Sequence, residues 1–374
     1  MNSRVSRWLL RGWLAVVLSI GAGPALAQTQ SWKFVVFGDS ISVTAESGIN
    51  TNILGELAAA VVKESPDFVL FLGDCAYQPS PASLSLWTNL MGAVYGAGIP
   101  VFPAVGNHEA SDQAAFTNFF GPTLPANGPS GELTSTYFVR YRNALVLVFN
   151  EFAVGNQSRV NQGWVEAVLA TNSQPHVIAA GHMPAFKLQH PDCLGTYPAN
   201  RDILWNTLSN AHCRLYFCGH DHFYDHCRLD DGDGNPDNDL HQMTVGTGGA
   251  MLYADGAYDG TNGVWTPVRV YHDAQFGYVT VTITGDVVST AWHYRTPTGA
   301  YAVGPDILTY SVVPPPRLGW SYSSGRLTLR WTGAGVLQSA PEPSGPFSEV
   351  VGASSPYSLE QVSGAQRFFR LMLQ

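Results

Sequence analysis

FVLFLGDCAY, residues 68–77, joins an apolar run of strand length to a glycine and an aspartate. The same order, a short apolar run and then a polar residue, occurs earlier at KFVVFGDS, residues 33–40. Between the two, Ile53, Leu57 and Val61 fall on one face of an expected helix. Buried strands that alternate with amphipathic helices are typical of βαβ units, so we predict an α/β fold.

The alternation continues further along the chain. A hairpin is expected where two alternating segments meet at Arg142-Asn143, and β-rich sequence follows the last expected helix. The expected strands are 34–37, 68–72, 101–104, 136–141, 144–149, 176–180, 214–218, 242–245, 278–284 and 287–294. The expected helices are 53–63, 84–95, 164–171 and 203–209.

The composition changes at Val313-Pro314-Pro315-Pro316. A proline run of this kind forms a semi-rigid polyproline linker, which we place at residues 313–317. Beyond it, apolar and polar residues alternate and turn-forming residues divide the chain into short strands. We predict a small all-β module at residues 318–374. It resembles β-sandwich appendages of bacterial secreted enzymes, which implies attachment to a cell surface or a polymer.

The chain begins with a pattern typical of a secretory signal peptide. Arg4, Arg7 and Arg11 precede an apolar stretch, and Ala25-Leu26-Ala27 fits the expected cleavage site. The apolar stretch is shorter than the roughly 20 residues that span a bilayer, which argues against an uncleaved anchor. We therefore expect residues 1–27 to be removed and the mature protein to be exported, to the periplasm or the medium, without a membrane span.

The formal net charge is −9, and removal of residues 1–27, with three arginines and no acidic residue, moves it to −12. A protein this acidic is a poor partner for nucleic acid or for anionic membranes.

Five cysteines follow the predicted signal peptide. In an oxidising compartment Cys193, Cys213, Cys218 and Cys227 could form two disulfides, in any of three pairings. Cys75 lies inside the 68–77 segment and is expected to be a free thiol. No C-x-x-C pair occurs, so a cysteine-ligated zinc is not expected.

Side chains that can bind metals follow the expected strands. Each has an ordinary alternative, because aspartate after glycine often forms a turn and histidine beside a strand is often a surface residue. Loops at the carboxyl ends of strands converge on one crevice in open α/β sheets, so these residues can meet. Their mixed donors suit a pair of first-row transition ions better than calcium or magnesium. The residues are Asp39, Asp74, Tyr77, Asn107, His108, His182, His220 and His222.

Taken together, five blocks resemble the signature of purple acid phosphatases, within the calcineurin-like metallophosphoesterases. The blocks are Gly38-Asp39, Gly73-Asp74-Cys75-Ala76-Tyr77, Gly106-Asn107-His108-Glu109, Gly181-His182 and Gly219-His220-Asp221-His222. The resemblance implies two mixed β-sheets in a sandwich flanked by helices, from about Trp32 to Val312. It also implies a ferric ion held by Asp39, Asp74, Tyr77 and His222. A divalent zinc, iron or manganese ion would be held by Asp74, Asn107, His182 and His220.

The first block departs from the family pattern. The purple enzymes have Gly-Asp-x-Gly there and the wider superfamily has Asp-x-His, whereas Ile41 stands at that position here. Isoleucine cannot replace a histidine ligand. Tyr77 stands where the purple enzymes supply a phenolate, so the resemblance preserves the ligand count.

The implied activity is hydrolysis of phosphate monoesters by metal-bound hydroxide. His108 and His190 are candidates to bind the phosphate and protonate the leaving alkoxide. His190 has a second interpretation as a surface histidine in a proline-rich loop. Fold and metals do not determine the substrate, so a phosphodiesterase or nucleotidase is an alternative. A non-catalytic surface-binding protein is a second one.

Two further segments could bind small ions. Asp231, Asp233, Asp237 and Asp239 resemble an acidic calcium loop, although the EF-hand pattern is absent and a hairpin tip is the alternative. Residues 246–250, GTGGA, could suggest a phosphate cradle, but a tight backbone turn beside the metals is the interpretation we prefer.

Overall fold

The structure is a computed structural model that describes residues 31–258, 264–312, 318–331, 335–360 and 367–373. The predicted signal peptide and the predicted linker lie outside these residues. Over the described ranges, no helix combines the length and apolar character that crossing a membrane requires.

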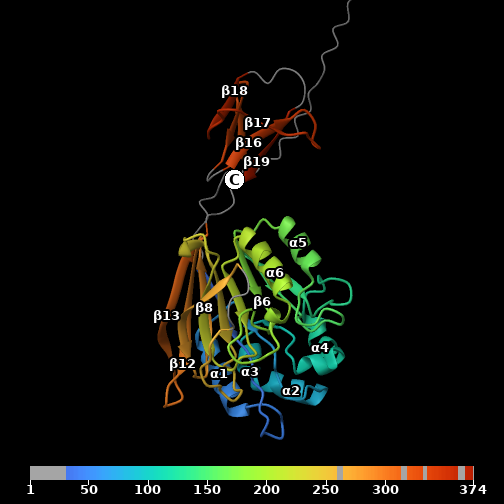
Figure 1. The fold of residues 1–374 in the computed structure, drawn as a ribbon, viewed down its shortest axis with the longest axis vertical. Helices are drawn as coiled ribbons and strands as arrows, with labels where there is room; N and C mark the ends of the chain where they lie inside the picture. Colours follow the sequence, from blue (N-terminus) through green and yellow to red (C-terminus); the bar gives the residue numbers. More distant parts are fainter. Residues whose placement is uncertain (1–30, 259–263, 313–317, 332–334, 361–366, 374) are drawn as a thin grey trace, which may run out of the picture.

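Six strands form the first large sheet, in the order β13-β12-β11-β1-β2-β3 (Figure 1). The central trio β1, β2 and β3 is parallel, and β11, β12 and β13 extend it as antiparallel strands. The strands are β1 (Ser31–Phe37), β2 (Phe68–Phe71), β3 (Val101–Pro103), β11 (Gly277–Thr284), β12 (Val287–Arg295) and β13 (Tyr301–Ser311).

Seven strands form the second large sheet, in the order β10-β8-β9-β7-β6-β5-β4. Its centre is parallel from β5 to β9, and the antiparallel strands lie at its two sides. The strands are β4 (Tyr137–Tyr141), β5 (Ala144–Val148), β6 (His176–Ala180), β7 (Leu215–Cys218), β8 (Tyr224–Asp230), β9 (Leu240–Val245) and β10 (Thr266–Asp273).

Helices connect the parallel strands and begin at defined caps. The side chains of Asn50 and Asn161 accept the amides of Ile53 and Trp164, which stabilises the first turns of α1 and α5. Figure 1 shows α5 and α6 side by side. The helices are α1 (Thr51–Lys63), α2 (Pro81–Leu90), α3 (Gly92–Gly96), α4 (Gln113–Phe120), α5 (Gln162–Ala170) and α6 (Pro198–Asn210). Short 3-10 turns are Glu109–Asp112, Gly121–Thr123, Leu194–Thr196 and Pro236–Asn238.

Large aromatic side chains fill the space between the two sheets. The ring of Phe34 in β1 meets that of Phe217 in β7 edge-on at 6.5 Å. Tyr224 of β8 stacks on Trp292 of β12 with ring centroids 4.2 Å apart. Every residue of β2, β5, β6 and β7 is buried, as expected for parallel strands covered on both faces. The predicted fold of two mixed sheets flanked by helices is confirmed.

Three strands of the two large sheets were not predicted, because their sequences do not show a clear strand pattern. Strand β8 carries buried Asp225 and His226, whose hydrogen bonds to Tyr258 and Asp306 satisfy them inside the core. Strand β13 contains Pro305, which argues against a central strand but is tolerated here because β13 lies at an edge. Strand β10 is largely exposed. The single helix expected at 84–95 is divided into α2 and α3.

Cys75 is a free thiol as predicted, but the expected disulfides and the expected calcium loop are not supported. Cys75, Cys213, Cys218 and Cys227 are buried free thiols, and Cys193 is buried too, so neither expected disulfide is formed.

Residues 231–239 are the tip of the β8–β9 hairpin. Their side chains cap neighbouring amides, as when Asp231 accepts that of Asp233, and no three carboxylates of the tip converge.

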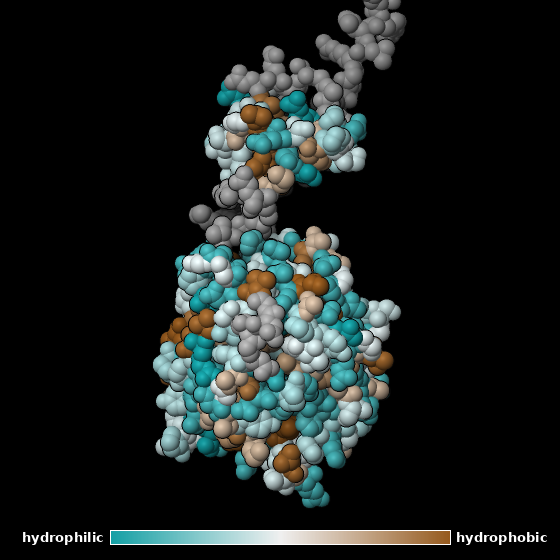
Figure 2. All heavy atoms as spheres, in the orientation of Figure 1, coloured by the Kyte–Doolittle hydropathy of each residue, from teal (hydrophilic) through white to brown (hydrophobic). Residues whose placement is uncertain are grey.

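The described residues after the predicted linker form two small antiparallel sheets, ordered β14-β15-β18 and β17-β16-β19. On the face of the described residues that Figure 2 shows, apolar residues are scattered among hydrophilic ones. The strands are β14 (Gly319–Ser323), β15 (Arg326–Arg330), β16 (Gly335–Ala340), β17 (Ser348–Glu349), β18 (Tyr357–Glu360) and β19 (Phe368–Leu373).

Candidate metal centre

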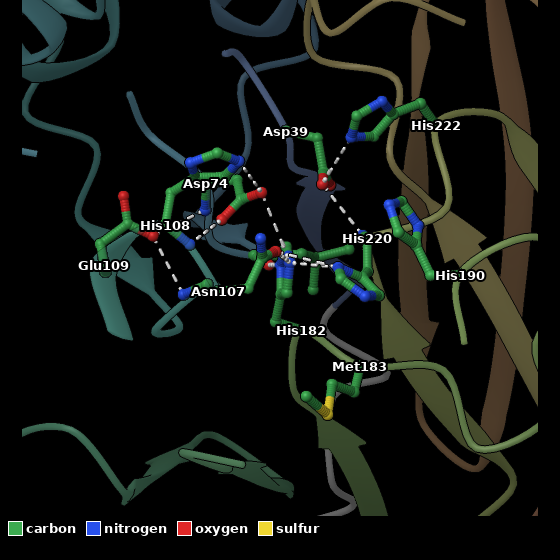
Figure 3. Close-up of polar contacts among 12 residues, drawn as sticks. Asp39, Asp74, Asn107, His108, Glu109, His182, Met183, His190, His220 and His222 are labelled. Carbon is green, nitrogen blue, oxygen red and sulfur yellow. Dashed lines mark hydrogen bonds and ion pairs between the residues drawn. The ribbon is translucent and has the colours of Figure 1, made fainter. Parts of the chain in front are cut away.

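Loops at the carboxyl ends of strands from both sheets meet at one place (Figure 3). Backbone hydrogen bonds join them: the Asp39 amide donates to the Gly73 carbonyl at 3.0 Å, and the Gly219 amide to the His182 carbonyl at 2.9 Å. The Gly38 amide reaches across to the Val245 carbonyl of the second sheet at 3.0 Å. The convergence predicted from the sequence is therefore observed.

The backbone is strained at three of these positions. Asp39, Asp74 and His220 have φ angles of 64°, 58° and 70°, in the left-handed region that non-glycine residues rarely adopt. Each such residue costs on the order of 1 kcal/mol or more and persists only where its surroundings impose it. Strain at three site residues indicates that the fold holds their side chains in specific directions.

Two glycines make room for the carboxylates. A Cβ atom added at Gly219 would lie 2.1 Å from Oδ2 of Asp39, and one added at Gly106 would lie 2.1 Å from Oδ1 of Asp74. Both distances are far below van der Waals contact. At these two positions the glycine before the candidate ligand is thus required by the packing of an aspartate from another block.

Asp39, Asp74 and His222 form one buried cluster whose ligand atoms lie within 4.8 Å of one another. His222 donates through Nδ1 to the Met251 carbonyl at 3.1 Å, so its Nε2 faces Asp39 Oδ1 at 3.7 Å with a free lone pair. Burial, together with the Asp74 carboxylate, raises the pKa of Asp39 well above its usual value. Asp39 Oδ2 is buried without a hydrogen-bond partner. An orphaned oxygen beside a second carboxylate fits a bound cation.

Asn107, His182 and His220 form a second cluster. Asn107 Oδ1 lies 2.8 Å from His182 Nε2 and 2.9 Å from His220 Nδ1, and the two nitrogens are 3.1 Å apart. His182 donates through Nδ1 to the Leu72 carbonyl at 2.7 Å, and burial lowers its pKa to about 4, so it is neutral with Nε2 unprotonated. On its far side, His220 Nε2 pairs with Asp192 Oδ1 at 3.2 Å. Such outer partners orient imidazoles for metal binding.

Asp74 lies between the two clusters. Its Oδ2 atom is 3.6 Å from His182 Nε2 in the second cluster, while it also belongs to the first. Its Oδ1 accepts the His108 amide at 3.0 Å. One carboxylate is therefore placed to serve two ions at once.

Tyr77 is placed at the wall of the same cavity. Its side chain is 40% exposed, and its ring lies 4.9 Å from that of His108. No hydrogen bond joins its hydroxyl to the Asp39 or Asp74 carboxylate in the described structure, so its role as a ligand stays a prediction. Ile41, which replaces the usual glycine or histidine, is buried and forms a β-bridge with Ile49.

The two candidate acids lie on opposite sides of the clusters. His108 donates through Nδ1 to the Tyr77 carbonyl at 2.7 Å, and its Nε2 lies 3.8 Å from Asp74 Oδ2. The ring of His190 stacks on that of His220 at 4.0 Å. The sequence left His190 open between a site residue and a surface histidine, and the structure places it at the site.

Asp221 holds the loop that carries His190. Its carboxylate accepts the amides of Leu188, Gln189 and His190 at 2.9 to 3.1 Å and the Nδ1 of His190 at 3.0 Å. Tyr253 approaches from the other side, with its hydroxyl 3.4 Å from His190 Nε2. Asp221 was only a spacer in the His-Asp-His block, and its role could not be read from the sequence.

Two buried glutamates support the ligand loops and were also missed. Glu109 accepts the amides of Asp74, Cys75 and Gly106 at 2.8 to 3.0 Å. Burial raises its pKa to about 8. Glu151 follows β5, so the rule that found the other residues, a polar side chain after a buried strand, would have found it as well.

A cavity of about 370 Å³ opens over both clusters. It is lined by residues of each cluster, by both candidate acids and by the loop at residues 249–253. The 246–250 segment, which leads into this loop, is tightly packed, because a Cβ atom at Gly248 would lie 2.4 Å from the Gly38 carbonyl oxygen. The 246–250 segment is thus a backbone turn beside the site, as predicted.

Comparison with known proteins gives a family and a fold. The family model for calcineurin-like phosphoesterase matches residues 33–224. A search of curated protein sequences finds no match.

Solved structures share the fold at low identity. Purple acid phosphatase PPD1 from yellow lupin (Lupinus luteus) seeds is 18% identical over 76% of this chain, with a TM-score of 0.56. This chain covers 54% of the lupin chain, about half of its length. PhoD is 13% identical over 75% of this chain and 70% of its own, with a TM-score of 0.53. GAP50, the anchor in the inner membrane complex of Plasmodium, is 13% identical over 76% of this chain and 89% of its own, with a TM-score of 0.53.

Proposed function

Because this chain belongs to the calcineurin-like phosphoesterase family, we propose that it is an exported acid phosphatase of the purple type that hydrolyses phosphate monoesters. The observation that carries the proposal is the position of Asp74, 3.6 Å from His182 of one donor cluster and within 4.8 Å of Asp39 and His222 in the other. A shared carboxylate between two donor sets is the arrangement that two-metal phosphoester hydrolysis needs.

The two donor clusters differ in chemistry. The first offers more charged oxygen, which suits a hard ferric ion, and the second is richer in neutral nitrogen and amide donors, which suit a divalent ion. When bound, such a pair polarises the phosphoryl group and lowers the pKa of a water molecule. The ferric ligands would be Asp39, Asp74, Tyr77 and His222. The ligands of zinc, iron(II) or manganese would be Asp74, Asn107, His182 and His220.

His108 and His190 would handle the phosphate and the leaving alcohol. Each presents Nε2 toward the cavity because its Nδ1 is engaged, by the Tyr77 carbonyl in one case and by Asp221 in the other. A protonated imidazole there binds a phosphoryl oxygen and can donate its proton to the departing alkoxide.

Export rests on the sequence pattern of residues 1–27. Analysis of the amino terminus of protein recovered outside the cytoplasm checks it, and a chain that retains Met1 in the cytoplasm would contradict it.

A paired substrate assay tests the activity. Metal-loaded protein is given 4-nitrophenyl phosphate and bis(4-nitrophenyl) phosphate, together with the variants Asp74→Ala and Glu166→Ala, the latter an exposed control on α5. We expect faster turnover of the monoester and a loss of at least about a thousandfold in Asp74→Ala, since the shared ligand is removed. A strong preference for the diester would overturn the monoesterase assignment. Two bound metals without turnover of either ester would instead favour a binding role.

A further inference from the structure

The cavity over the metal centre has no lysine or arginine among the described residues that line it. Among these residues, the only groups that can carry positive charge are histidines of the site. The chain as a whole is acidic, with a formal net charge of −9. Beyond the metal site and the two candidate acids, therefore, the described lining offers an anionic group hydroxyls such as those of Ser42 and Thr44 but no charged partner.

The rest of the lining is mainly apolar and aromatic. Two rings flank the histidines: Tyr253 stacks on His222 at 4.4 Å, and Tyr77 lies 4.9 Å from His108. Met251 and Val43 continue the wall with side chains that are 71% and 61% exposed, although both are apolar. Both apolar side chains are therefore exposed to solvent at the cavity wall.

The wall is tied to the metal ligands through its backbone. The Met251 carbonyl accepts the Nδ1 proton of His222 at 3.1 Å, and the Tyr253 amide donates to the His222 carbonyl at 3.0 Å. The side chains of residues 251 and 253 therefore keep a defined position relative to the place where the phosphate binds. A wall held this way can contact the organic part of an ester during turnover.

We propose that this cavity selects phosphate monoesters of aromatic or other apolar alcohols and discriminates against substrates with a second anionic group, such as diphosphates and phosphorylated acids. The proposal rests on the proposed monoesterase activity. An apolar group that leaves water for the wall gains free energy in proportion to the area that it buries. A second phosphate or carboxylate would lose hydration there without gaining a partner, because recognition of such groups uses arginine or lysine.

Three esters with leaving alcohols of similar acidity separate binding from chemistry. Benzyl phosphate, 4-carboxybenzyl phosphate and ethyl phosphate are compared on metal-loaded protein. We expect kcat/KM for benzyl phosphate to exceed that of each of the other two by about tenfold or more, mainly through KM. Equal kcat/KM for the three esters, or a preference for the carboxylated one, would overturn the proposal while leaving the phosphatase activity intact. If none of the three esters is turned over, the proposed phosphatase activity itself is wrong.

Two variants and a control locate the effect. Met251→Ser removes apolar wall and is expected to reduce the preference for benzyl over ethyl phosphate about threefold or more. Val43→Lys supplies a cation at the wall and is expected to raise kcat/KM for the carboxylated ester relative to the benzyl ester. Ile307→Ser alters a side chain that is 57% exposed on β13 outside the cavity, and all three rates should stay unchanged. If the ratios move no more in Met251→Ser and Val43→Lys than in the control, the wall does not select the substrate.

Discussion

Glu151 is expected to act as a neutral hydrogen-bonding group beneath the second metal cluster. Its Oε2 accepts the amides of His182 and Met183 at 2.7 and 2.8 Å, and its Oε1 lies 2.6 Å from the Tyr216 hydroxyl oxygen. The same hydroxyl also lies 2.7 Å from the Met183 carbonyl. If Glu151 is protonated it can donate to Tyr216, which then donates to Met183, and every polar group is satisfied.

The size of the effect follows from these contacts. Glu151→Ala leaves two buried amides without an acceptor, at about 1 to 3 kcal/mol each, so we expect a loss of about 3 kcal/mol or more in the free energy of unfolding. Glu151→Gln keeps an acceptor for both amides and a donor for Tyr216, and should cost about 1 kcal/mol or less near pH 5. Glu166→Gln, an exposed change on α5, is the control.

The pH dependence distinguishes the neutral from the charged form. Burial raises the pKa of Glu151 to about 7, from the ordinary value of 4.5. Between these values the folded chain binds more protons than the unfolded one, so the free energy of unfolding falls as pH rises, by at most about 3 kcal/mol in all. Glu151→Gln lacks this slope and should overtake the native protein between about pH 5 and pH 7, where the native protein loses this stability.

Urea unfolding of metal-free protein across pH, followed by circular dichroism, is the assay. Chelation matters because a bound cation nearby would favour the carboxylate. The reasoning is refuted if Glu151→Gln is as unstable as Glu151→Ala, or if its difference from the native protein does not change with pH.

Three further predictions concern the acid loop, the core and the ferric ligand. Asp221→Asn should lower kcat about tenfold with metal content unchanged, because His190 loses its partner; an unchanged kcat in steady-state assays would remove His190 from the reaction. Burial lowers the pKa of His241 to about 3, so the native protein loses stability as pH falls below about 6.5. His241→Gln should therefore move the midpoint of acid unfolding, followed by circular dichroism, to lower pH. An unchanged midpoint would contradict this. Tyr77→Phe should abolish visible absorption in iron-loaded protein, and a colourless native iron form would show that Tyr77 is not a ligand.

The parallel core of the fold was predictable because its strands obey one simple rule. Segments such as 68–71 and 144–148 are wholly apolar and buried on both faces, so the strand can be located from the sequence to within a residue. Strand β8 could not be recognised, because its aspartate and histidine find partners far away in sequence, such as Asp306 eighty residues later. Such long-range contacts form only in the folded chain, so the local sequence does not indicate them.

The same distinction applies to the site. The candidate ligands could be picked out because each follows a buried strand, and the topology then brings the strand ends together. The supporting residues were not, since Asp221 and Glu109 act on amides of loops that the sequence does not place beside them. His190 was ambiguous for the same reason, because its position depends on the clamp that Asp221 provides.

If Asp74 serves two metal ions at once, its loss should cost the protein both. Metal content per chain is measured by elemental analysis on native protein, Asp74→Ala and Asp39→Ala purified identically. We expect two metals per native chain, one in Asp39→Ala, where only the first cluster is damaged, and fewer than one in Asp74→Ala. Two metals retained in Asp74→Ala, or no more than one in the native protein under metal-replete conditions, would contradict it.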